Sequence, residues 1–163
     1  IPQSVTSIGR NVFARCSSLT SIVVAEGNTK YDSRENCNAI IETRSKSLLY
    51  GCQTSLIPNS IKSIGMGSFT YCESLTSINI PDSVKVIANM AFYHCSSLTE
   101  ITIPGSVKSL GHDIFSNCFS LKTITYNGTR EKWKKIKKDT LADSWISGIP
   151  AKFVQCTDGL VKI

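Results

Sequence analysis

A repeat constrains the fold of this chain more than any other feature of its sequence. Four segments align without gaps and begin at Ile1, Ile57, Ile80 and Ile103, so the last three starts are 23 residues apart. One unit holds too few apolar side chains to bury its own face, and neighbouring units must therefore stack on one another. The sequence predicts a solenoid whose coils start at residues 1, 57, 80 and 103.

The spacing of apolar residues within one coil predicts its local structure. Leu75, Ile78 and Ile80 follow the L-x-x-L-x-L pattern of a leucine-rich repeat and predict a short strand. A second short extended segment follows, and residues 89–94 predict a short helical turn that closes the coil. The expected fold is a right-handed leucine-rich-repeat solenoid with α/β-type coils, in which short parallel strands alternate with short helical turns.

Stacking of the coils predicts rows of equivalent side chains, because neighbouring parallel strands lie about 4.7–4.9 Å apart. We expect one stack of phenylalanines and one ladder of cysteines. Their members are Phe13, Phe69, Phe92 and Phe115, and Cys16, Cys72, Cys95 and Cys118. Side chains in parallel register aim poorly for a disulfide, so we expect the ladder cysteines to be buried free thiols.

An insertion of about residues 25–56 separates the first repeat from the second. Within it, two partly apolar segments at 37–42 and 47–52 flank a polar turn and predict a β-hairpin. A turn centred midway between them would place Cys37 opposite Cys52, within reach of a disulfide. Two small unbonded residues at these hairpin positions are an equally acceptable interpretation.

The repeat stops after Tyr126, and residues from about 127 to 163 predict a cap made of a helix and a closing hairpin. Thr129 is the expected helix N-cap, with Trp133 and Ile136 on the face toward the core. The opposite face of the predicted helix carries Arg130, Lys134, Lys137 and Lys138. No equivalent cap precedes Ile1, so we expect the N-terminal part of the array to be missing from this chain.

The basic face of this helix has two interpretations. Between residues 130 and 138, six basic residues stand against Glu131 alone, so this segment supplies +5 of the net charge of +6 and leaves +1 elsewhere. The face is either a solvated surface that keeps the end of the array soluble or a patch that attracts sulfated glycans, teichoic acids or acidic proteins. The weak charge elsewhere argues against a nucleic-acid-binding fold.

The repeat pattern IPxSVxxIGxxxFxxCxSLTxIxI resembles the BspA-like, or Treponema pallidum-type, leucine-rich repeat. This family occurs in surface and secreted proteins of bacteria and in some protozoan parasites. The hairpin with Cys37 and Cys52 and the YNGTxxxW…CTDG ending resemble segments common in it. The resemblance implies a curved parallel solenoid displayed outside the cell, often implicated in adhesion to host proteins or other microbes. It supplies no catalytic or ligand residues.

Motifs for catalysis, cofactors and metals are absent from the sequence. It contains no C-x-x-C, H-E-x-x-H, G-x-G-x-x-G, P-loop or G-x-S-x-G pattern, so we predict no enzyme activity, no cofactor and no metal site. His94 and His112 stand at repeat positions whose content varies, and we expect both to be solvated. His94 precedes Cys95 directly, but neighbours on a turning segment point in different directions and do not form a nucleophile and its base.

The outward side of the predicted strands is the candidate binding face, on the inner, concave side of the array. Alternation assigns to it a set of mostly small polar residues. They are Ser21, Val23, Ser77, Asn79, Glu100, Thr102, Thr123 and Thr125. This set has no aromatic or arginine anchor, so we expect binding that is weak per coil and multivalent over a longer array.

The sequence thus predicts an extracellular or cell-surface recognition module whose partner is a protein or glycan. Its targeting signal would lie outside this chain. No apolar run exceeds four residues, so we expect no membrane insertion in this chain. Two other interpretations stay open: a passive stalk that positions another domain, and the repeat region of a larger enzyme whose catalytic domain is absent here.

Overall fold

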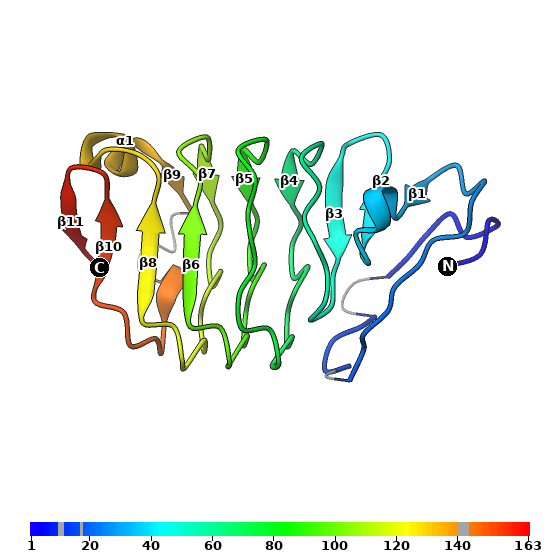
Figure 1. Ribbon diagram of the computed structural model, residues 1–163, viewed down its shortest axis with the longest axis horizontal. Helices are drawn as coiled ribbons and strands as arrows, with labels where there is room; N and C mark the ends of the chain where they lie inside the picture. The colour runs from blue at the N-terminus through cyan, green and yellow to red at the C-terminus, as the bar shows by residue number, and fades with distance from the viewer. Residues whose placement is uncertain (10–11, 17, 140–143) are drawn as a thin grey trace.

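Stacked repeats form the body of the molecule. The computed structural model of this protein describes residues 1–9, 12–16, 18–139 and 144–163. Successive coils lie side by side along the long axis, with the N-terminus at one end and the C-terminal strands at the other (Figure 1). The strands of the described residues form one seven-stranded and one four-stranded sheet, and both run across the coils.

The seven-stranded sheet receives three short strands from the insertion, one from each of the three regular repeats that follow it, and one from the C-terminal segment. In spatial order it contains β1 (Tyr31–Asp32), β2 (Ile40–Glu42), β3 (Ser47–Tyr50), β4 (Ser63–Ile64), β5 (Val86–Ile87), β7 (Ser109–Leu110) and β9 (Lys137–Lys138). Strands β1 to β3 pair antiparallel, and β3 to β9 pair parallel. Ile64 lies beside Ile87, and Ile87 beside Leu110, so equivalent residues are in register. The predicted second extended segment and the period are confirmed.

The four-stranded sheet contains the strand of the L-x-x-L-x-L pattern in only two repeats. It consists of β11 (Gly159–Lys162), β10 (Phe153–Cys156), β8 (Thr123–Tyr126) and β6 (Glu100–Ile103). The equivalent residues 77–80 form no ladder with β6 among the described residues. Thr99 N still donates to Thr76 O at 3.3 Å, so the coils separate only beyond this point.

The predicted helical turns are wrong. All of residues 57–128 are described, and they contain no helix. Met90 and His94 have φ of 57° and 58°, which interrupts helical hydrogen bonding. The N–H groups of Met90 and Phe92 instead donate to His112 O and Ile114 O of the next coil, at 2.9 and 3.0 Å. The turns are therefore held by contacts between coils.

Three phenylalanines of the predicted stack lie face to face and are fully buried. The ring centroids of Phe69 and Phe92 are 5.2 Å apart at an interplanar angle of 8°, and those of Phe92 and Phe115 are 5.6 Å apart at 14°. Trp145 covers the C-terminal end of the stack, 6.2 Å from Phe115. The stack is thus confirmed for the last three repeats.

The first repeat does not continue this stack, contrary to prediction. Phe13 contacts Tyr50 edge to face, with centroids 5.4 Å apart. Gly51 lies directly against the Phe69 ring, so that a Cβ atom added at Gly51 would overlap this ring. The N-terminal repeat and the insertion together form a second apolar cluster, the N-terminal cluster, whose buried members are Ile22, Val24, Tyr31, Ile40 and Cys52.

The inserted hairpin of β2 and β3 is present and has a bulge. Glu42 lies opposite Ser47, as the predicted turn requires, but the register shifts by one residue beyond Ile41. A shift of one residue turns the following side chains to the other face. Cys37 therefore packs in the main core and Cys52 in the N-terminal cluster, and both are free thiols. The Cys37–Cys52 disulfide is not formed in this structure.

The C-terminal segment adds the α-helix α1 (Arg130–Lys135) and the antiparallel pair β10–β11. Two short 3₁₀-helices, η1 (Arg34–Asn36) and η2 (Ser144–Ile146), complete the elements of the described residues. Thr129 Oγ1 accepts a hydrogen bond from Lys132 N at 3.3 Å, as expected of the N-cap. Trp133 and Ile136 are buried against the last coil, also as expected.

Candidate recognition surface

The outward face is the exposed side of the four-stranded sheet together with residues 77–79. Along β6 the buried Ile101 and Ile103 alternate with the exposed Glu100 and Thr102. Seven of the eight predicted residues are exposed, and Thr125 is half-buried. Glu100 pairs with Thr123 and Thr102 with Thr125 in a row across β6 and β8, and Ser77 and Asn79 lie on the preceding coil, outside this ladder. Ser21 and Val23 lie on the N-terminal repeat, away from this row.

The outward face continues onto β10 and β11, which the sequence analysis missed. Val154 pairs with Ile124, so Phe153 lies next to Thr123 on the exposed side. Phe153 is 47% exposed, and Leu160 on β11 is 58% exposed. These two side chains give the face an apolar end. The sequence predicted a closing hairpin in this segment, but not that β10 pairs with β8, because β10 lies outside the repeat period.

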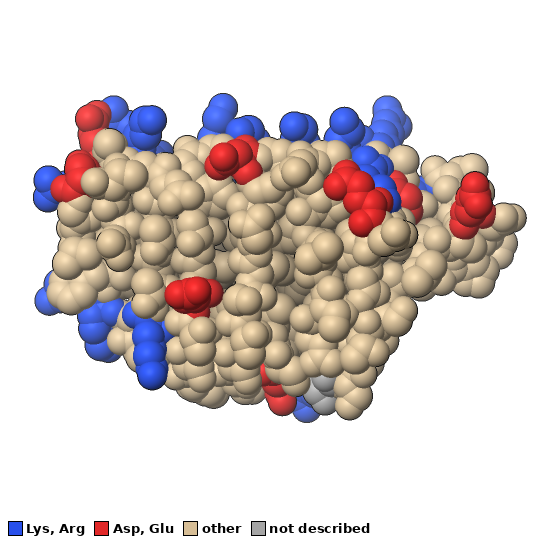
Figure 2. All heavy atoms as spheres, in the orientation of Figure 1, with Lys and Arg blue, Asp and Glu red and all other residues tan. Residues whose placement is uncertain are grey.

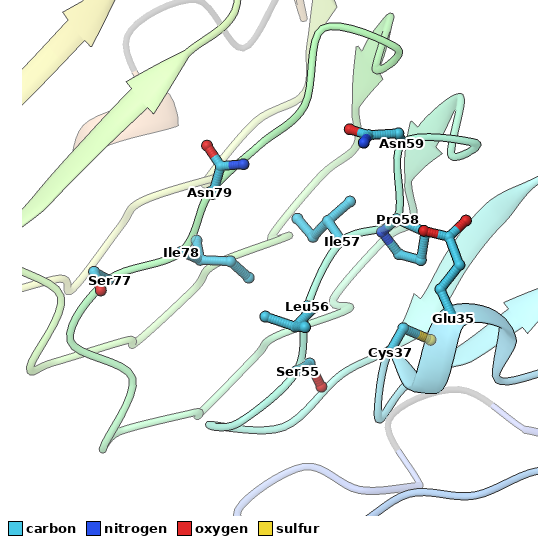
Figure 3. Close-up of a pocket in the computed structure, with 10 residues that line it drawn as sticks. All are labelled: Glu35, Cys37, Ser55, Leu56, Ile57, Pro58, Asn59, Ser77, Ile78 and Asn79. Carbon is cyan, nitrogen blue, oxygen red and sulfur yellow. The ribbon is translucent and has the colours of Figure 1, made fainter.

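A groove of about 400 Å³ borders the other end of the outward face (Figure 3). It opens between residues 55–59 and residues 77–79. On its other side, Leu56 N donates to Cys37 O of the insertion at 2.9 Å. Leu56 and Ile78 point toward one another from the two segments, and the groove carries the polar groups of Glu35, Asn59 and Asn79 at its margins (Figure 3). Leu56 is 65% exposed.

The outward face carries little charge. Figure 2 shows the surface over β6 and β8 as largely uncharged, with one acidic group over β6. Small hydroxyl and amide side chains between Leu56 and Phe153 can exchange hydrogen bonds with a polypeptide backbone. The arrangement of two apolar ends and a polar middle is suited to non-covalent recognition.

The predicted basic stripe on one helix is wrong, because α1 ends at Lys135. Lys137 and Lys138 lie on β9 instead, where pairing with β7 replaces further helical turns. Lys138 Nζ lies 4.8 Å from the centroid of the Trp133 ring, and partial burial lowers the pKa of this lysine. Arg130 pairs with Asp158 at 3.6 Å. Of the four predicted residues, only Lys134 is an exposed basic side chain on α1 with no ion pair among the described residues.

Two of the ladder cysteines, Cys72 and Cys95, are not reactive thiolates. Cys95 Sγ donates to Phe69 O at 3.1 Å, and Cys118 Sγ to Phe92 O at 3.0 Å. Burial raises the pKa of Cys72 to about 12 and that of Cys95 well above its ordinary value. Their buried thiols therefore stay protonated. All seven cysteines of the chain are free, but Cys16 is exposed, so the expectation of a buried ladder fails for the first repeat.

The two histidines are half-buried, contrary to prediction. The His94 ring lies edge-on to Tyr71 and Phe119, with centroids 4.8 and 5.7 Å away. His112 Nδ1 lies 3.0 Å from Asp113 Oδ2, and Ser116 Oγ donates to the other oxygen of Asp113 at 2.8 Å. The carboxylate stands between the other two groups, so this is not the serine–histidine–aspartate order of a hydrolase.

Two further observations concern the described part of the chain. It contains no group of three or more His, Cys, Asp or Glu side chains placed to hold a metal ion. None of its helices is long and apolar enough to cross a membrane.

The comparisons with known proteins agree with the repeat and its fold. A leucine-rich repeat protein from Eubacterium ventriosum is 28% identical, with a TM-score of 0.69, over 78% of this chain and 35% of its own length. The pneumococcal vaccine antigen PcpA is 21% identical, with a TM-score of 0.61, over 97% of this chain and 44% of its own. This chain thus spans less than half of either protein. No curated protein matches it.

The family comparison covers most of the chain. Residues 1–49 and 42–153 match the family described as BspA type leucine rich repeat region (6 copies). The matched residues include the N-terminal repeat, the inserted hairpin and α1, as well as the three regular coils. Proteins of this family are typically non-catalytic repeat proteins. The chain therefore belongs to the BspA-type leucine-rich repeat family.

Proposed function

We propose that this chain is an extracellular or cell-surface recognition module that binds a protein partner through its outward face and has no catalytic activity. The observation that carries the proposal is the exposed surface that extends from the groove at Leu56, past residues 77–79 and over the four-stranded sheet, to Phe153, with a polar middle and apolar ends. Exposed apolar side chains at the ends of a polar surface can serve as anchors for a partner.

The proposed architecture is a right-handed solenoid with a C-terminal cap. Parallel strands joined by a crossover are almost always right-handed. Trp133 on α1 is 1% exposed and contacts Tyr126 of the last coil, with centroids 5.2 Å apart, so α1 covers apolar surface that the array would otherwise expose. A location outside the cell is supported by membership of a family that occurs in surface and secreted proteins.

A binding screen with a matched pair of variants tests the proposal. The 163-residue chain is applied to purified extracellular-matrix proteins at low and moderate salt. Thr102→Arg places a long charged side chain in the middle of the outward face, and Thr6→Arg makes the same change at an exposed site of the N-terminal repeat. We expect Thr102→Arg to abolish binding that Thr6→Arg leaves unchanged.

Other outcomes favour the two remaining interpretations. A chain that binds none of the matrix proteins, or binds them equally in both variants, favours a passive stalk. Turnover by a longer natural protein that contains this segment would assign it to an enzyme as its repeat region. Either outcome overturns the proposed role of the outward face.

A further inference from the structure

A row of lysines crosses the seven-stranded sheet beside its turns. One lysine directly precedes each of β3, β4, β5 and β7, and a fifth begins β9. The lysine row consists of Lys46, Lys62, Lys85, Lys108 and Lys137. Backbone hydrogen bonds link each to the one before, from Lys62 N to Lys46 O at 2.9 Å through to Lys137 N to Lys108 O at 3.0 Å. The row is therefore fixed by the register of the sheet.

The charges of the lysine row are not neutralised within the chain. Four of the five lysines are exposed, and Lys85 is half-buried. Lys85 Nζ donates to the backbone carbonyl of Asp82 at 3.2 Å, not to its carboxylate. Within the described residues, none of the five forms an ion pair. Figure 2 shows basic side chains along the edge where these strands turn.

The spacing of the lysine row makes the ammonium groups repel one another. Neighbouring strands lie about 4.7–4.9 Å apart, so five backbones in register span about 19 Å. Adjacent charges then fall within the screening length of about 8 Å at physiological salt. A linear chain of negative groups laid across the strands would relieve this repulsion at every coil.

We propose that the lysine row binds a linear anionic polysaccharide that lies across the strands. Serine hydroxyls follow three of the lysines directly, at Ser47, Ser63 and Ser109, and can hydrogen-bond to sugar hydroxyls. The exposed aromatic side chains of the described residues, Phe119 and Phe153, lie on other segments, so the row has no platform for stacking nucleic-acid bases. This surface is distinct from the outward face.

The experiment measures binding of the whole chain to a heparin fragment long enough to span the row. A triple variant removes the three lysines that recur with the 23-residue period, Lys62→Gln, Lys85→Gln and Lys108→Gln. The control removes the same charge from three exposed lysines on or next to the four-stranded sheet, Lys122→Gln, Lys152→Gln and Lys162→Gln. Thermal melting of each variant verifies that it is folded.

We expect the triple variant of the lysine row, the row variant, to bind heparin at least about tenfold more weakly than the wild type. The affinity of the control variant for heparin should change by less than about threefold. Affinity should also fall with salt in the wild type and rise with fragment length until the row is spanned. Equal losses in both variants would overturn the proposal, because net charge alone would then explain binding. Tighter binding of oligothymidylate, lost in the same variant, would overturn the choice of a polysaccharide.

The outward face and the lysine row are tested separately by this design. Thr102→Arg should leave heparin binding intact, and the row variant should leave binding to a matrix protein intact. Failure of one proposal is thus distinguishable from failure of the other.

Discussion

The thiol of Cys95 donates a hydrogen bond to the backbone carbonyl of Phe69 in the preceding coil, with a distance of 3.1 Å between Sγ and O. Cys118 makes the equivalent bond to Phe92 at 3.0 Å. Cysteine is small and apolar enough for the core and still offers a weak donor. This dual role explains the buried free cysteine beside the phenylalanine in the last two repeats.

Replacement of Cys95 by alanine should destabilise the protein by about 1–3 kcal/mol, because it leaves the buried Phe69 carbonyl without its donor and opens a small void. The free energy of unfolding from urea titration measures the effect. Cys16 is exposed and supplies the matched control, for which Cys16→Ala should change stability by less than about 0.5 kcal/mol. Equal effects of the two substitutions would contradict the role assigned to the Cys95 thiol.

Thiol titration should find seven reactive cysteines in denaturant without reductant, because all seven are free in the structure. In the native protein, Cys16 should react first, since the other six are buried or half-buried. A count of five in denaturant would reveal one disulfide, and a bridge between Cys37 and Cys52 would mean that the bulge in the hairpin is misplaced. Mass spectrometry of peptides after alkylation identifies the protected pair.

The period of the sequence was sufficient to predict what depends on stacking alone. Phe69, Phe92 and Phe115 are in register because each coil is 23 residues long, and alternation along 100–103 and 123–126 indicated which side chains face outward. The hairpin register near Glu42 also followed from local turn chemistry. These features require no knowledge of how distant segments compete for the same hydrogen bonds.

Features that depend on such competition could not be predicted. Residues 89–94 have a helical pattern, but the N–H groups of Met90, Phe92 and His94 bond to the next coil, and Met90 and His94 adopt left-handed conformations. The charge spacing after Arg130 suggested a longer helix, yet pairing of β9 with β7 ends it at Lys135. The lysine row was recognisable at three positions 23 residues apart, whereas Lys46 and Lys137 join it only through strand pairing.

Alkaline pH should weaken the fold through its buried thiols. Burial raises the pKa of Cys72 to about 12 and that of Cys95 well above its ordinary value. An unfolded cysteine has a pKa of about 8.5, so the unfolded state releases protons first as the pH rises. The stabilisation that the two protonated thiols give to the folded state is therefore complete below about pH 8.5. It is lost progressively as the pH rises toward the pKa values of these thiols in the folded protein.

Urea titrations at pH 8 and pH 10 measure this effect. The wild type should lose stability between the two, and the double variant Cys72→Ala, Cys95→Ala should be less stable at pH 8 but lose less on going to pH 10. The Cys16→Ala variant should retain the wild-type pH dependence. If the double variant also retained the wild-type pH dependence, the buried thiols would not be the source of that dependence.

Substitution of Gly51 by alanine should destabilise the protein by about 1–3 kcal/mol, because the added Cβ overlaps the buried Phe69 ring. The matched control is Gly9→Ala, where the nearest heavy atom to the added Cβ is a Val12 methyl at 3.6 Å, an ordinary contact. Thermal melting compares the two. A Gly51→Ala protein as stable as the wild type would mean that the inserted segment around Gly51 is not seated against the end of the phenylalanine stack.

Phe92 is the central member of that stack, in contact with a ring on either side, and its loss tests whether the coils share one interior. Phe92→Ala should cost about 3–5 kcal/mol of unfolding free energy, because the cavity lies between two rigid coils that cannot close over it. Phe119→Ala removes the same side chain from a site that is 56% exposed, and it should cost much less. Urea titration of both variants gives the comparison. Similar losses would show that the two rings have similar surroundings and that the stack does not hold adjacent coils together.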